Sequence, residues 1–382
     1  MAFGIICEYN PFHNGHLHQI DQIKMTSDEP IICVMSGNFT QRGDAAIVDK
    51  YARAEMALLS GADLVLELPV PYCLSSAEYF ASAGVNILAR AGVDKLCFGS
   101  ESADAERIKR IASVACSSEF KAECAGLPAS EGSAAAYFDL LAERSGVKNI
   151  LSNDILGIEY TKAIIKNGYD MQIFPIKREG SAYLDRELKE NVHPSASAIR
   201  ENIKSESLEN IKGFVPASTL ELLKREEKAS LDSAGDGILL FLRLINADDL
   251  DVAISDRGLV NRILSAAHEC KTFDEFEQRL QTKKYTKSAI RRAILYILLG
   301  IKQSDLDLAP TYATLLGANE RGREYLSSIR KNEGCIRIVT KPASAEDCRQ
   351  TELSYKADAL YTICFESKRE SGFYIKKSPV IV

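Results

Sequence analysis

Residues 3–20 read FGIICEYNPFHNGHLHQI, an apolar run followed by a polar turn and then by a helical pattern. The run at 3–7 predicts a buried strand, and 16–24 predict the helix that follows it. His13 and His16 are three residues apart at the start of this helix, so their side chains face the same way, and Gly15 lets a ligand approach the backbone. The unpaired N–H groups and positive dipole end of a helix N-terminus suit a polyphosphate.

The histidine pair is open to two other interpretations. The rings can be ordinary loop side chains, or they can bind a metal ion. No third ligand is evident near them, and zinc-binding histidines on a helix are usually four residues apart rather than three. Their position directly after the first strand of an α/β pattern favours the phosphate-binding interpretation.

The rest of the first half repeats the order of strand and helix. Short β-branched runs alternate with helical patterns, which is typical of a parallel sheet with crossover helices. Further strands are expected at residues 31–35, 64–68, 95–98 and 171–176. Further helices are expected at residues 50–59, 77–91, 105–115, 134–143 and 155–165.

The second half is a succession of amphipathic helical patterns. We expect helices at residues 217–226, 237–245, 259–268, 288–299 and 352–362, with one late strand at 335–340. The acidic stretch 205–210 is the candidate linker. The prediction is therefore an α/β domain with a parallel sheet over residues 1–205, followed by a mainly α-helical domain over residues 206–382.

The composition limits the classes of partner. The chain has 382 residues and a formal net charge of −6, so binding to a polyanion requires a local basic patch. Its ten cysteines are scattered singly without a CxxC pair, which predicts reduced thiols and no metal site. The sequence opens without a signal-peptide pattern, and no apolar run approaches the ~20 residues of a membrane span. We expect a cytoplasmic protein that has no membrane partner, and no protein partner is evident.

Several sequence blocks resemble those of a known superfamily and of one family within it. His13-Asn14-Gly15-His16 resembles the HxGH signature of the HIGH-type nucleotidyltransferases, which bind ATP there and attack its α-phosphate. The ordered blocks are GIICEYNPFHNGH (4–16), MSGNFTQRGD (35–44), DKYARAEMAL (49–58), FGSE (98–101), SNDILGIEY (152–160), IKREG (176–180) and SASAIR (195–200). Together they are similar to the bacterial tRNA(Met) cytidine acetate ligases, and they span most of residues 1–205.

The resemblance implies a Rossmann-like nucleotidyltransferase domain and a two-step reaction. Acetate and ATP give acetyl-adenylate and pyrophosphate, and the acetyl group then passes to the wobble cytidine of elongator tRNA(Met), giving N4-acetylcytidine. The implied partners are ATP, acetate and elongator tRNA(Met). The catalytic pair is His13 and His16. The implied ATP contacts are Cys7, Glu8, Tyr9, Asn10, Pro11, Phe12, His13, Asn14, Gly15, His16, Leu17, His18, Gln19, Ile20, Gly99, Asn153 and Arg178.

The chemistry of such a reaction indicates what else the site needs. Acetate is already an anion at neutral pH, so its attack on a phosphate needs positioning and charge neutralisation but no general base. Lys177 and Arg178 follow the last predicted strand of the first half, at the edge of the sheet where ligands bind. Solvated surface charge is the alternative for both. Any Mg²⁺ is expected to enter mainly with ATP, because no acidic cluster suggests a protein cage.

Two further groups are candidates with ordinary alternatives. Ser195, Ser197 and Arg200 resemble a phosphate-contacting motif, although Ser195 can equally be a helix cap. Asn38, Gln41 and Arg42 follow the second strand and are candidates to hold acetate or the target base, or they form an ordinary surface loop.

A basic stretch lies near the end of the helical half. Residues 281–302 contain six cations and no acidic residue, and apolar positions from Ile290 to Ile301 mark a buried helix stripe. This pattern leaves Lys287 and Arg291 together on another face of the helix, one turn apart. A solvated face is the bland alternative to RNA binding. The candidate tRNA phosphate contacts are Lys283, Lys284, Lys287, Arg291 and Arg292.

Two rival functions use the same motif. A small-molecule adenylyltransferase releases pyrophosphate but has no need of a large helical domain with a basic face. A non-catalytic nucleotide- or RNA-binding module has no need of the intact histidine pair. Exchange of labelled pyrophosphate into ATP that depends on acetate separates the ligase from both.

Overall fold

The computed structural model describes residues 1–126, 133–151, 154–178, 195–205, 208–282 and 284–382. Within these ranges the centre of the molecule is an eight-stranded sheet with β8 beside β6. Its strands lie in the order β5 (Gln172–Lys177), β4 (Lys95–Ser100), β1 (Phe3–Cys7), β2 (Ile31–Ser36), β3 (Leu64–Leu68), β6 (Tyr312–Ala318) and β7 (Arg337–Val339), and β8 is Val380–Ile381. Strands β1 to β5 are parallel, whereas β6 runs antiparallel to β3.

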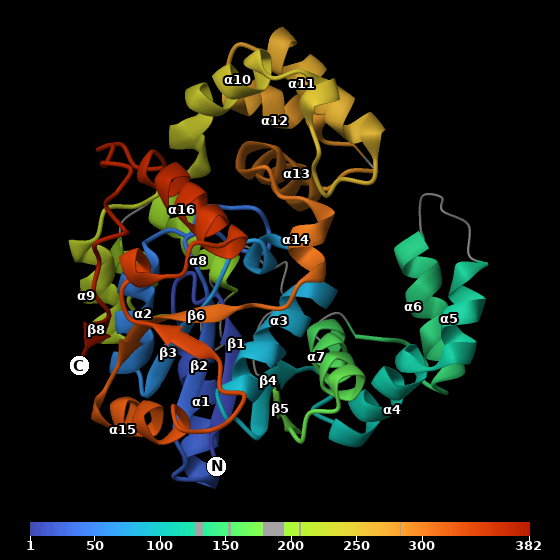
Figure 1. Ribbon diagram of the computed structural model, residues 1–382, viewed down its shortest axis with the longest axis vertical. Coiled ribbons are helices and arrows are strands. Elements are labelled where there is room, and N and C mark those ends of the chain that lie inside the picture. The colour runs from blue at the N-terminus through green and yellow to red at the C-terminus, as the bar shows by residue number, and fades with distance from the viewer. Residues whose placement is uncertain (127–132, 152–153, 179–194, 206–207, 283) are drawn as a thin grey trace.

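The helices surround this sheet and extend beyond its carboxyl edge (Figure 1). The first half contains α1 (Asn14–Thr26), α2 (Lys50–Leu59), α3 (Ala77–Arg90), α4 (Ala105–Cys116), α5 (Ser118–Ala125), α6 (Ser133–Arg144), α7 (Asp154–Asn167) and α8 (Ala196–Ser205). The second half contains α9 (Ala217–Arg225), α10 (Gly235–Leu244), α11 (Arg257–Glu269), α12 (Phe273–Leu280), α13 (Lys287–Leu299), α14 (Gln303–Asp307), α15 (Glu320–Ile329) and α16 (Arg349–Thr362).

The predicted α/β architecture of the first half is confirmed. The bounds of β1, β3 and α2 coincide with the predicted ranges, and the other predicted elements of this half differ by one or two residues at an end. Strands β2 and β3 are buried along their whole length, as expected for central parallel strands covered on both faces. Helix α2 starts where the Asp49 carboxylate accepts hydrogen bonds from the N–H groups of Tyr51 and Ala52.

The end of the chain returns to the sheet. The late strand predicted at 335–340 is present as β7, but the sequence patterns did not predict β6, β8 or the pairing of these strands with the first half. Residues 208–307 are helical as expected, but β6 pairs with β3 through Leu64 and Ala318, and β7 and β8 pair with β6. In Figure 1 the orange β6 crosses beside the blue strands of the first half. The sheet therefore contains strands from both sides of the boundary predicted at residue 205.

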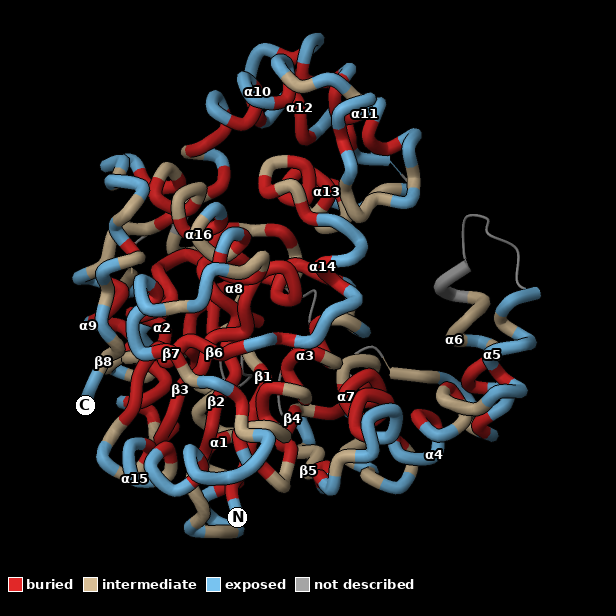
Figure 2. The backbone as a smooth tube through the Cα atoms, viewed as in Figure 1, coloured by how far each residue is buried: buried red, intermediate tan, exposed pale blue. Residues whose placement is uncertain are grey.

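The burial pattern distinguishes the sheet from the helices above it. Figure 2 shows that the central strands are almost entirely buried, whereas α10, α11 and α12 present exposed outer faces. Helices α13 and α14 lie between these helices and the sheet (Figure 1). None of the helices in the described ranges combines the length and apolar composition needed to cross a bilayer. The segment after β2 contacts α13 of this helical part, where Arg292 donates a hydrogen bond to the Gln41 carbonyl.

Candidate active site

The two histidines of the HxGH motif cap helix α1 reciprocally. His13 is the N-cap residue, and its Nδ1 accepts a hydrogen bond from the Gly15 N–H at 3.1 Å. The Nδ1 of His16 accepts from the His13 N–H at 3.2 Å, which completes a capping box. The two rings stack with centroids 3.7 Å apart. The three-residue spacing is what this reciprocal pair of hydrogen bonds requires.

This capping geometry determines which ring nitrogen can donate. Because Nδ1 is the acceptor in both rings, the neutral imidazoles of His13 and His16 carry their proton on Nε2. Burial lowers the pKa of His16 well below its ordinary value, and the neighbouring His13 and Arg178 lower it further. The His16 ring is therefore neutral at pH 7 and provides a hydrogen-bond donor rather than a full charge.

A cavity of about 510 Å³ opens beside these rings, within the size range of small-molecule sites. It lies at the carboxyl ends of β1, β4 and β5, and parts of α1, α7, α8 and α13 complete its walls. The predicted residues that line it are Cys7, Glu8, Tyr9, Asn10, His13, Gly15, His16, His18, Gln19, Gln41, Arg42, Gly99, Lys177, Arg178, Ser195, Ser197, Arg200 and Arg292. The predicted residues in the lining thus come from five of the seven resembling blocks, and the block 152–160 reaches the cavity through Ile155, Leu156, Gly157 and Tyr160, which were not predicted.

The geometry of the serine-rich segment at the start of α8 is compatible with both predicted roles, that of a helix cap and that of a phosphate contact. The Ser195 hydroxyl caps α8 by accepting a hydrogen bond from the Ala198 N–H at 3.2 Å. Arg200 donates to the Asn10 carbonyl at 2.7 Å and to the Ser197 hydroxyl at 3.2 Å. These contacts join α8 to the turn after β1, and the three predicted residues of this segment line the cavity.

Some predicted ATP contacts support the turn and do not line the cavity. Phe12 and Ile20 are fully buried in the core, and Phe12 packs against Tyr9 with ring centroids 4.8 Å apart. Asn14 donates from its side chain to the Gly213 carbonyl at 2.9 Å. Pro11 and Leu17 also stand outside the lining. The predicted contact at Asn153 lies outside the described residues.

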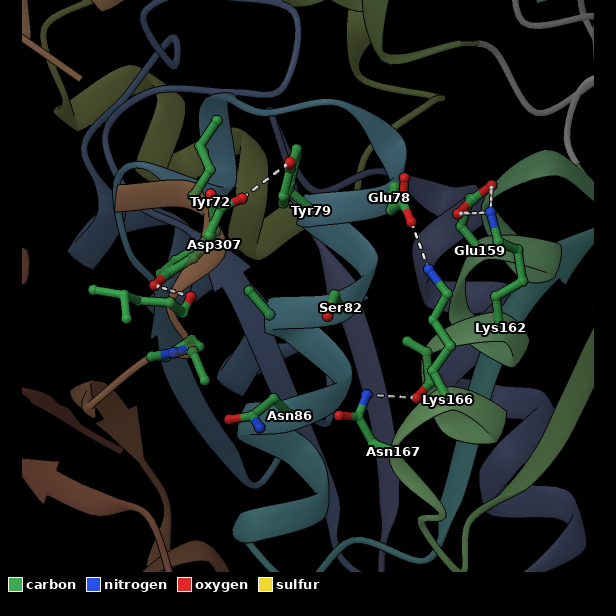
Figure 3. Close-up of a pocket in the computed structure, with 16 residues that line it drawn as sticks. Tyr72, Glu78, Tyr79, Ser82, Asn86, Glu159, Lys162, Lys166, Asn167 and Asp307 are labelled. Atoms are coloured by element: carbon green, nitrogen blue, oxygen red, sulfur yellow. Dashed lines mark hydrogen bonds and ion pairs between the residues drawn. The ribbon is translucent and has the colours of Figure 1, made fainter. Parts of the chain in front are cut away.

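A second cavity of about 360 Å³ lies between α3, α7 and the segment after α14. Figure 3 shows that its lysines point to acids: Lys166 pairs with Glu78 at 2.7 Å and Lys162 with Glu159 at 2.8 Å. The residues that line this cavity include none of the predicted ATP contacts. The cavity beside the histidine pair is therefore the candidate active site.

Comparison with known proteins places the chain in a family. Residues 1–373 match the family described as HIGH Nucleotidyl Transferase. A tRNA(Met) cytidine acetate ligase of Clostridium perfringens is 35% identical over 99% of this chain and 98% of its own length. The ligase of Acetivibrio thermocellus is 35% identical over 100% of both chains. The chain belongs to the tRNA(Met) cytidine acetate ligase family.

Solved structures of this family match over the full length. Crystal structures of Thermotoga maritima TmcAL, one apo and one bound with alpha-thio ATP, cover 100% of both chains at 31% identity. Their TM-scores are 0.87 and 0.88. The family resemblance predicted from the ordered sequence blocks is thus confirmed.

The block at residues 49–58 supports the site from beneath, which sequence reasoning missed. Arg53 is fully buried and donates to the carbonyls of Glu8 and Gly37, which follow β1 and β2. Lys50 is buried between Glu67 at 2.8 Å and Asp358 at 2.9 Å. The sequence signal for this role was the presence of two cations, Lys50 and Arg53, among the apolar residues of one helix. A cation is seldom buried without a specific partner, so this pattern indicates buried ion pairs or hydrogen bonds.

Asn38 belongs to this support and does not face the cavity. Its side-chain carbonyl accepts a hydrogen bond from the Lys50 N–H, and its amide donates to Asp358, both at 2.9 Å. Asn38 is buried, whereas Gln41 and Arg42 of the same predicted group reach the cavity lining. This segment is therefore polar for two reasons. Asn38 holds the buried Lys50 cluster together, whereas Gln41 and Arg42 face the cavity.

The predicted basic face of α13 requires a correction. Arg291 is buried, where it forms ion pairs with Asp44, Glu277 and Asp232. Arg292 donates to the Gln41 carbonyl at 3.2 Å and lines the cavity. Neither arginine lies on an outer surface with Lys287, because the segment after β2 packs against this side of α13.

The lysines of that stretch remain on the surface. Lys284 is about half exposed and pairs with Asp256 at 2.9 Å. Lys287 is also about half exposed and pairs with Glu277 at 3.1 Å. Lys283 lies outside the described residues. The outer basic surface is therefore smaller than the sequence suggested.

Proposed function

We propose that this protein is an ATP-dependent acetate ligase that acetylates the wobble cytidine of elongator tRNA(Met). In the first step a carboxylate oxygen of acetate attacks the α-phosphate of ATP, and pyrophosphate leaves. In the second step the N4 amine of cytidine attacks the acetyl carbonyl of acetyl-adenylate. AMP leaves, the amine loses a proton, and N4-acetylcytidine is formed.

The observation that carries the proposal is the capped histidine pair in the wall of the cavity. Its Nε2–H groups are suited to donate hydrogen bonds to phosphate oxygens that gain charge during the attack. The N-terminus of α1 supplies further N–H donors at the same place. Lys177, Arg178 and Arg200 contribute full positive charges from two other segments. This set serves positioning and electrostatic stabilisation, which is what attack by an existing carboxylate anion requires.

The remaining assignments extend the proposal to the whole chain. Residues 1–205 provide the nucleotide site, and the helices after residue 206 provide the surface for tRNA. Mg²⁺ enters with ATP, so the protein itself needs no acidic cage. The cytoplasm is the proposed location, because ATP and mature tRNA are both available there.

Incubation of the purified protein with ATP, isotopically labelled acetate and elongator tRNA(Met) tests the function directly. Mass analysis of the digested nucleosides is expected to reveal one labelled acetyl group on cytidine. In parallel, exchange of labelled pyrophosphate into ATP is expected to depend on acetate. Exchange that is indifferent to acetate contradicts the proposal and favours a small-molecule adenylyltransferase. Absence of any exchange favours the non-catalytic module.

The lysines at the start of α13 are the proposed tRNA contacts of the helical part. The double variant Lys284→Gln with Lys287→Gln is expected to bind tRNA more weakly. The slope of log affinity against log salt should also become shallower by roughly one to two, because fewer phosphates are neutralised and fewer counterions are released on binding. Filter binding over a range of salt concentrations measures both quantities. The matched control is Lys109→Gln with Lys121→Gln on α4 and α5. An unchanged slope in the α13 variant would show that Lys284 and Lys287 belong to a solvated helix face that does not contact tRNA.

A further inference from the structure

Two adjacent arginines on α13 have opposite environments. Arg291 forms ion pairs with three carboxylates, those of Asp44, Glu277 and Asp232. Arg292 lines the cavity and donates to the Gln41 carbonyl at 3.2 Å. Among the carboxylates in the described ranges, none forms an ion pair with Arg292. Successive helix positions differ by about 100° in direction, so one arginine anchors the helix while the next faces the cavity.

The position of Arg292 is well defined by its surroundings. Gly43 packs so closely on α13 that a Cβ atom built there would lie 2.6 Å from the Arg292 backbone nitrogen. Asp44, the next residue, is one of the acids that hold Arg291. The segment after β2 therefore contacts the start of α13 through three residues, Gln41, Gly43 and Asp44. The Arg292 side chain is presented to the cavity by this rigid contact.

The guanidinium of Arg292 is partly buried, and no carboxylate in the described ranges neutralises its charge. Burial lowers the pKa of Arg292, which reflects the cost of keeping its charge away from water. A bound anion offsets this cost, and the flat fork of N–H donors matches a carboxylate or a phosphate in a bidentate manner. The substrates of the proposed reaction offer both groups, acetate and the phosphates of ATP.

The strand order indicates which anion lies here. In the sheet, β1 is flanked by β4 on one side and β2 on the other, so the order in which the chain adds its parallel strands reverses between β1 and β4. Nucleotides bind at such a switch point in open α/β sheets. Gly99, Lys177 and Arg178 line the cavity on the β4–β5 side, whereas Arg292 reaches it beside Gln41, which follows β2. The side away from the nucleotide is left for the second substrate.

We propose that the guanidinium of Arg292 binds the carboxylate of acetate and positions it for attack on the α-phosphate. This assignment rests on the proposed ligase function. The approach of one anion to another is opposed by charge repulsion, and a cation on the acetate side reduces that repulsion while it orients the attacking oxygen. The helical part of the chain thus contributes a substrate-binding residue to the active site.

Kinetics of acetate-dependent pyrophosphate exchange test this role without tRNA. Arg292→Gln is expected to raise the KM for acetate by about 10- to 100-fold, the effect of losing one charge-assisted bidentate contact. The KM for ATP should stay at the wild-type value, which also reports that the nucleotide site is folded. Arg292→Lys keeps the charge but loses the fork, so its KM for acetate is expected to lie between those of wild type and Arg292→Gln. The matched control is Arg279→Gln, an exposed arginine of α12 that pairs with Glu269.

The outcomes separate this inference from the function on which it rests. If the wild-type protein exchanges pyrophosphate with acetate but Arg292→Gln retains the wild-type KM for acetate, the assignment is wrong and the function stands. A rise in the KM for ATP alone, or an equal rise for both substrates, also overturns it and assigns Arg292 to a phosphate. If Arg292→Gln does not fold, as judged by thermal unfolding, a wild-type KM for acetate in Arg292→Lys counts against the assignment. Wild-type protein without acetate-dependent exchange refutes the ligase function itself.

Discussion

Replacement of His16 by alanine is expected to lower acetate-dependent pyrophosphate exchange by about 10²- to 10³-fold, the usual effect of removing a donor that stabilises developing charge. His16 lies in the cavity wall with its Nδ1 used in the cap, so Nε2–H is the group that the substitution removes from the site. Steady-state exchange kinetics measure the loss. The affinity for tRNA should be unchanged, because the proposed tRNA contacts are the lysines at the start of α13. His268→Ala, on the exposed side of α11, is the matched histidine control.

A second substitution separates the capping role of His16 from its chemical role. Glutamine is a common residue at the third position of a capping box, so His16→Gln keeps an acceptor for the His13 N–H. We expect His16→Gln to unfold near the wild-type temperature and still to lack exchange activity. Wild-type activity in either His16 variant would refute the catalytic role. Recovery of activity in His16→Gln alone would show that the ring matters only for the cap.

Replacement of Lys50 by alanine is expected to destabilise the fold by about 3–5 kcal/mol, the cost of removing one partner from a buried ion pair. The Lys50 amine lies 2.8 Å from Glu67 on β3 and 2.9 Å from Asp358 on α16, and all three side chains are buried. The substitution leaves two carboxylates without their cation. Urea denaturation measures the change in the free energy of unfolding. Lys224→Ala, which removes the exposed ion pair with Glu221, is the control and should cost about 1 kcal/mol or less.

The pH dependence of this loss follows from the pKa of Asp358. Burial, and then the charge of Glu67, raise the pKa of Asp358 to about 6 although Lys50 opposes the shift. A carboxyl group with a raised pKa in the folded state stabilises the fold when protonated, and this contribution is lost as pH rises through the folded-state pKa. Without Lys50, which lowers the pKa of Asp358, this carboxyl group is still harder to ionise. The destabilisation by Lys50→Ala should therefore be larger at about pH 8 than at about pH 5. An equal loss at the two pH values would contradict this account of the cluster.

Much of the first half could be predicted because its signals are local. The strands have continuous apolar runs, the helices have clear amphipathic periods, and Asp49 directly precedes α2 as its cap. The run at β6, Tyr312–Ala318, is equally apolar, but its pattern did not predict a strand. A short run buried on both faces has the same composition in a strand as in a buried helix. Only its pairing with β3, far away in the sequence, distinguishes the two.

The candidate site divides in the same way. His13, Gly15 and His16 could be assigned from the sequence because a cap, a glycine and a helix start interact within four residues. The roles of Arg291 and Arg292 could not, because a helical wheel identifies the face away from the apolar stripe but cannot tell whether that face meets water. Asp44, Glu277 and Asp232 come from three separate segments to bury Arg291. The sequence alone determined the strand, turn and helix that present the histidine pair, since these depend on neighbouring residues. The tertiary structure alone decided which cations are anchors and which face the cavity, since a charge can be buried only where distant partners meet it.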